Sequence, residues 1–143
     1  MSRSCTALPV LFLLLGCVAS PEPAPADPNP MLVEVGRTEF ARYCAACHGT
    51  DARGAGPAAT ALRTPPADLT RIAALRGGVF PADEISAWID GRLAPPAHGT
   101  REMPVWGVRL AEGLPPGELS QDLVRGRILT LVEYLRSIQA PAH

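Results

Sequence analysis

Apolar residues recur at helical spacing along much of the chain, and the clearest pattern lies near its C-terminus. From Leu119 to Gln139 one apolar stripe recurs in steps of four and three residues. Its members are Val124, Ile128, Leu131, Leu135 and Ile138. Ser120 is suited to cap the start of this segment, and Pro141 follows its end. The pattern therefore predicts a long C-terminal helix with one buried face.

A second helix is predicted from about residue 30 to residue 44. Asn29 is suited to the N-cap, and Pro30 to the first helical position. The apolar stripe of this segment comprises Val33, Gly36, Phe40 and Cys44. A glycine inside a helix costs about 1 kcal/mol relative to alanine. We therefore expect another backbone to lie close to Gly36.

Two shorter helices are predicted between these segments. One covers residues 69–75, with Asp68 as its cap and Gly77 at its end. The other covers residues 81–90, with Gly91 after its end. Three side chains are expected to face inward from the second: Ile85, Trp88 and Ile89. Loops rich in proline or glycine surround these helices, at residues 49–57, 64–68, 94–107 and 114–117. Since no segment alternates as a strand does, an all-α fold is expected.

The first 16 residues resemble the signal peptide of a bacterial lipoprotein. Arg3 precedes the apolar run Leu8–Gly16, which has about half of the ~20 residues that a membrane-spanning helix needs. Leu14-Leu15-Gly16-Cys17 resembles a lipobox, which implies cleavage before Cys17 and lipid on that cysteine. Val18 in the next position resembles outer-membrane sorting. The alternative is an ordinary signal peptide that is cut later, for instance after Ala19, and releases a soluble protein.

Residues 17–30 are expected to form a spacer between this signal and the domain of residues 31–143. The five prolines from residue 18 to residue 30 favour an extended, semi-rigid segment that would reach about 40 Å. The alternative is a disordered start to the mature chain.

The central motif is Cys44-Ala-Ala-Cys47-His48, the signature of covalent c-type haem attachment. Residues three apart on a helix share a face, so both sulfurs can reach one porphyrin. His48 follows directly and can provide the proximal iron ligand. A thioredoxin-like pair would need a βαβ context, and a structural zinc site usually needs a second pair of ligands. Neither feature is visible in the sequence. The glycine-rich loop after the motif also lacks the strand and the G-K-S/T of a nucleotide-binding loop.

The sixth iron ligand is expected to be Met103. Its thioether would favour ferrous iron, and Pro104 stiffens the loop around it. The alternative for Met103 is simple filling of a gap in the core. His98 is the other candidate ligand, whereas His143 is expected to be exposed at the terminus.

These motifs, in this order, resemble a bacterial class I cytochrome c over residues 32–139. The matching segments are Gly36–Phe40, Cys44–Gly49, Gly56-Pro57, Met103-Pro104 and Glu133–Leu135. The resemblance implies an all-helical fold whose N- and C-terminal helices cross around one covalent haem c. It implies that Gly36 and Phe40 meet Tyr134 and Leu135. It also implies that the Pro57 carbonyl accepts a hydrogen bond from His48. Trp88, Trp106, Arg92, Arg101 and Arg109 are candidates for the haem edge or its propionates, the alternative being ordinary packing and solvation.

The charge pattern narrows the choice of partners. All 13 basic residues are arginine, and loss of Arg3 leaves 12 against 14 acidic residues. Docking through lysine, as in mitochondrial carriers, is therefore ruled out, and no clustered basic surface suggests nucleic acid. We expect a non-enzymatic one-electron carrier in the bacterial periplasmic space, held at the membrane by its lipid and serving membrane or periplasmic redox proteins. The alternatives are a permanently docked subunit of a larger oxidoreductase, a small haem peroxidase and a gas sensor. The oligomeric state is left open.

Overall fold

The computed structural model describes residues 27–92 and 103–141. The predicted signal peptide, Cys17, most of the predicted spacer, His98, Arg101 and His143 lie outside the described residues. The described α-helices are α1 (Pro30–Tyr43), α2 (Ala45–His48), α3 (Ala82–Asp90), α4 (Trp106–Arg109) and α5 (Glu118–Ser137). Three 3₁₀ turns join them: η1 (Ala59–Ala61), η2 (Leu69–Arg71) and η3 (Ala74–Arg76). No strand occurs in these two ranges, which confirms the all-α prediction.

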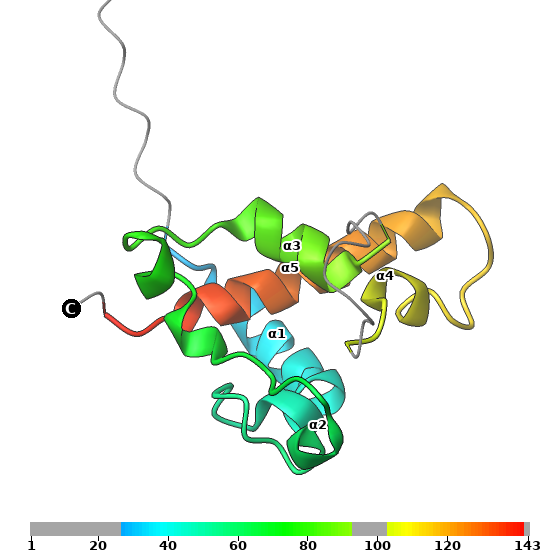
Figure 1. Cartoon of the computed structure of the whole chain (residues 1–143). Coiled ribbons are helices and arrows are strands. Elements are labelled where there is room, and N and C mark those ends of the chain that lie inside the picture. Colours follow the sequence, from blue (N-terminus) through cyan, green and yellow to red (C-terminus); the bar gives the residue numbers. More distant parts are fainter. Residues whose placement is uncertain (1–26, 93–102, 142–143) are drawn as a thin grey trace, which may run out of the picture.

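The first and last helices cross at Gly36, as expected. Figure 1 shows α1 (cyan) and α5 (orange to red) crossing, and the two make the most extensive contact among the elements. A Cβ atom added to Gly36 would lie 1.9 Å from the carbonyl oxygen of Thr130 and 2.9 Å from the Cβ of Tyr134. The rings of Phe40 and Tyr134 pack with their centroids 5.2 Å apart. The absence of a side chain at residue 36 therefore allows the two backbones to touch.

The core lies along the predicted stripe of α5. Val124, Ile128, Leu131 and Leu135 are buried, and Ile138 is partly buried against the same core. Helix α3 packs on the other side of α5 and contributes Ile85 and Ile89. Trp88 was expected to face inward, but it is 39% exposed. A nine-residue helix with one main neighbour buries a narrow stripe, and here the stripe runs through positions 85 and 89.

Polar contacts define the ends of several elements. The Asn29 side chain accepts hydrogen bonds from the first-turn amides of α1, and Asp68 does the same for Thr70 in η2, so these two predicted caps are confirmed. The predicted cap at Ser120 is wrong: α5 begins at Glu118, and the Ser120 hydroxyl donates to the Pro115 carbonyl of the preceding turn. Gly77 follows η3 with a left-handed φ of 66°. The helix predicted over 69–75 is instead two 3₁₀ turns. The side chain of Gln139 binds this segment, accepting from the Ala73 amide at 2.8 Å and donating to the Leu69 carbonyl at 2.9 Å.

The single turn α4 was not predicted. It falls where the sequence suggested only a loop broken by proline and glycine. Gly107 is buried in this turn. A Cβ atom at this position would lie 2.5 Å from side-chain atoms of both Asp90 and Arg92, so the close approach requires glycine. Contact with the end of α3 therefore stabilises a turn whose local sequence gives little indication of one. Among the helices of the described ranges, none has the length and apolar character of a membrane span.

Candidate cofactor-binding site

The Cys44–His48 motif forms a tight turn at the end of α1. Cys44 ends α1 and also precedes α2. Its carbonyl accepts from the amide of Cys47 at 3.1 Å and from that of His48 at 2.9 Å. Both cysteines are half-buried free thiols. The turn therefore holds two free thiols and an imidazole within five consecutive residues, directly after the C-terminal end of α1.

The glycine-rich loop after the motif folds back onto α2. Its amides satisfy the last carbonyls of the motif: Gly54 donates to His48 at 2.7 Å, and Gly56 donates to Cys47 at 3.0 Å. A Cβ atom at residue 56 would lie 2.4 Å from the Ala46 carbonyl oxygen, so this approach requires glycine. The loop thus caps the turn that presents the sulfurs and the imidazole.

His48 is half-buried, and its ring has a defined hydrogen-bond partner. Nδ1 lies 3.3 Å from the carbonyl oxygen of Ala67, whereas the expected partner was the carbonyl of Pro57. The chain after the glycine loop brings residue 67 to the ring, and Pro57 itself is exposed. A carbonyl can only accept, so Nδ1 carries the proton and Nε2 is left with the lone pair that a metal requires.

Burial lowers the pKa of His48, while the bond to Ala67 opposes this shift. The neutral imidazole is consequently the favoured form near neutral pH, and it is the form that ligates metals. Burial, with smaller contributions from Glu39 and Cys47, raises the pKa of Cys44 to about 12. An attacking thiol of a C-x-x-C oxidoreductase has a lowered pKa instead. The environment of Cys44 is therefore the opposite of that which a thioredoxin-like reaction needs.

Met103 lies against the same core as the predicted haem-attachment motif. Met103 and Cys44 are both partly buried and pack on the hydrophobic core built around α1 and α5. Cys44 and Met103 therefore border one hydrophobic core, although their segments lie about 60 positions apart in the chain. This placement is consistent with a ligand role for Met103 and with packing alone.

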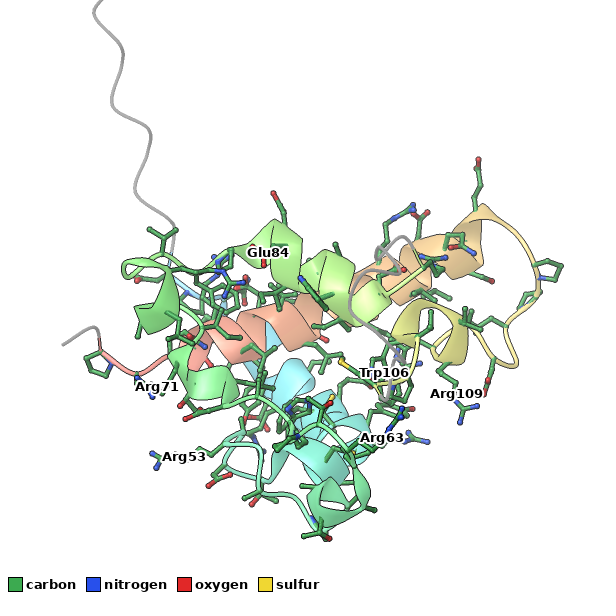
Figure 2. The ribbon with its side chains drawn as sticks, viewed as in Figure 1. Arg53, Arg63, Arg71, Glu84, Trp106 and Arg109 are labelled. Carbon is green, nitrogen blue, oxygen red and sulfur yellow. The ribbon has the colours of Figure 1, made fainter. Side chains whose placement is uncertain are left out.

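Trp106 and the two described arginines of the predicted haem edge each contact other side chains of the protein. Trp106 packs edge-on against Tyr43, with ring centroids 5.6 Å apart. Arg92 binds Asp90 at 2.6 Å and also contacts Gln121. Arg109 pairs with Glu112 at 2.9 Å and projects from α4 in Figure 2. Both guanidinium groups therefore have protein partners.

A cluster that the sequence analysis missed lies beside the motif. Arg127 of α5 donates to the carboxylate of Glu39 and to the hydroxyl of Tyr43, both of which belong to α1. The spacing of Glu39 and Tyr43, four residues apart, was a signal that they share a face of α1. Nothing in the sequence indicated that Arg127 would reach them from α5.

No family model, curated protein or solved structure matches this chain. Within residues 27–92 and 103–141, no group of three or more histidine, cysteine, aspartate or glutamate side chains is placed to hold a metal ion.

Proposed function

We propose that the protein is a class I cytochrome c that carries single electrons through one covalently bound haem c. The observation that carries the proposal is the turn at Cys44–His48. There two half-buried thiols are followed directly by an imidazole whose Nδ1 donates to a carbonyl. The crossing of α1 and α5 at Gly36 supports the same family.

The residues of this site fit the proposed cofactor. Cys44 and Cys47 would form the two thioether bonds, and His48 would offer Nε2 to the iron because Nδ1 is engaged by Ala67. Met103 would provide the second iron ligand through its thioether. When bound, the haem supplies the one-electron chemistry between its ferric and ferrous forms. The protein holds the ligands and limits the access of water.

In this proposal both His48 and Met103 bind the iron, which leaves no position open for a substrate. The protein would therefore be an electron carrier and not an enzyme. A peroxidase or a gas sensor requires an iron position that is open or easily opened. The second candidate is a permanently docked haem c subunit, which uses the same site. Purification of the native protein separates the two, because a subunit remains bound to its oxidoreductase in stoichiometric amounts.

We place the protein in the bacterial periplasmic space, attached to the outer membrane through lipid on Cys17. The partners would be membrane or periplasmic redox proteins that donate and accept electrons. An anchor and a spacer would raise the effective concentration of the carrier near such partners. Cys17→Ala tests the anchor: it should abolish acyl labelling and release the protein from membranes. Unchanged membrane recovery would reject lipidation at this residue.

The haem assignment is tested by producing the full chain in a bacterium with its c-type maturation system. The wild-type protein should keep its haem through denaturation and acid extraction. The Cys44→Ala and Cys47→Ala variants should each keep one thioether, so their pyridine haemochrome bands should move toward that of a haem with one free vinyl group. The double variant should lose covalent haem. A wild-type product without covalent haem would refute the proposal.

A further inference from the structure

Arg127 occupies a central position between α1 and α5. Its Nε and Nη2 lie 3.0 and 2.8 Å from one carboxylate oxygen of Glu39, and Nη2 lies 2.9 Å from the hydroxyl of Tyr43. The guanidinium carbon also lies 5.2 Å from the centre of the Tyr43 ring. The side chains of Arg127 and Glu39 are only 32% and 18% exposed, so this pair is shielded from much of the solvent. One arginine thus restrains both the ring and the hydroxyl of Tyr43.

Tyr43 in turn contacts the segment that carries Met103. Its ring meets that of Trp106 at an interplanar angle of 63°, in the edge-on arrangement that aromatic pairs favour. Trp106 is the first residue of α4 and follows Met103 by three positions. In Figure 2 it lies between α4 and the end of the molecule that holds α2.

The segment around Met103 has little stability of its own. Helix α4 has four residues, far fewer than an isolated helix needs. Its position must therefore come from tertiary contacts, and the contact between Tyr43 and Trp106 joins it directly to α1. Tyr43 also immediately precedes Cys44, so it is joined to the attachment motif through the chain and to the Met103 segment through its contact with Trp106.

We propose that Arg127 is a positioning residue that, through Tyr43 and Trp106, holds the Met103 segment at the haem site. The inference rests on the proposed function. A small external ligand such as cyanide must displace Met103 before it binds ferric iron. Its apparent affinity therefore depends on the fraction of molecules in which the methionine is detached. Loss of the Arg127 contacts increases that fraction.

The test compares ferric holoproteins by cyanide titration, by their near-infrared sulfur–iron band and by thermal unfolding. In Arg127→Gln, the apparent dissociation constant for cyanide should fall about tenfold and the band should weaken. Tyr43→Phe, which removes only the hydroxyl partner, should lower the constant by a smaller factor. Arg136→Gln is the matched control: Arg136 also lies on α5, pairs with Glu133 at 3.5 Å and packs 5.9 Å from the centre of an aromatic ring, that of Phe80. It should leave cyanide binding within twofold of wild type.

Three results with the variants would overturn the inference. The first is a destabilised Arg127→Gln protein whose cyanide constant stays within twofold of wild type, because the arginine would then be purely structural. The second is an equal effect of Arg136→Gln. The third result concerns Tyr43→Phe, which replaces Arg127→Gln if that variant does not accumulate. Unchanged cyanide binding in Tyr43→Phe would then overturn the inference. A wild-type protein with covalent haem but no sulfur–iron band would instead reject Met103 as the ligand, and the inference with it.

Discussion

Replacement of Gly36 by alanine should weaken the contact on which the frame of the domain depends. The added Cβ would lie 1.9 Å from the backbone oxygen of Thr130, where ordinary contacts begin at 3.4 Å, so α1 and α5 would have to separate by roughly 1.5 Å. A backbone atom cannot rotate away as a side chain can. Overpacking of this kind costs up to about 3 kcal/mol, and the better helix propensity of alanine returns about 1 kcal/mol. We therefore expect a net loss of about 2 kcal/mol.

Gly126→Ala is the matched control on the partner helix. A Cβ atom added there meets nothing within 4 Å, so only the propensity gain of about 1 kcal/mol remains. Urea unfolding of the two holoproteins, followed by far-ultraviolet circular dichroism, should shift the midpoints in opposite directions, by about 1 M downward for Gly36→Ala. A Gly36→Ala protein as stable as wild type, or midpoints that move together, would refute the crossing geometry.

Three further predictions concern the caps, the C-terminal contacts and the thiols. Asn29→Ala should cost about 1 kcal/mol in urea unfolding, and Asn29→Asp should keep most of this stability; equal losses would argue against the cap. Gln139→Glu should cost about 2 kcal/mol, because a carboxylate can still accept from Ala73 but cannot donate to two carbonyls; wild-type stability would contradict these contacts. In the haem-free precursor, Cys44 should be alkylated more slowly than Cys47, because burial raises the pKa of Cys44 to about 12. Mass mapping should show this difference in native buffer and its loss in urea, and equal native rates would contradict it.

Periodicity was sufficient to predict the two helices that form the frame. The stripes of α1 and α5 are long, and each helix buries one face against a large neighbour, so the apolar spacing determines the orientation. Gly36 was informative for a related reason. A residue that weakens a helix needs a compensating contact, and Thr130 provides it.

The errors fall where short elements depend on distant contacts. Helix α4 forms because Gly107 fits against the end of α3, and the local sequence carries no sign of this. The carbonyl beside His48 belongs to Ala67, 19 positions along the chain, where the resemblance implied Pro57. Arg127 reaches Tyr43 across the helix crossing, a contact that requires the three-dimensional arrangement. Trp88 lies beside the buried stripe of a short helix, where one step in position separates core from surface.

The most direct test of the account is a pyridine haemochrome measurement on the exported, purified protein after denaturation and acid extraction. We predict one haem per chain, retained covalently, with the band of a haem whose two vinyl groups are both saturated as thioethers. A protein that is correctly exported in a host with the maturation system, yet carries no covalent haem, would contradict the account.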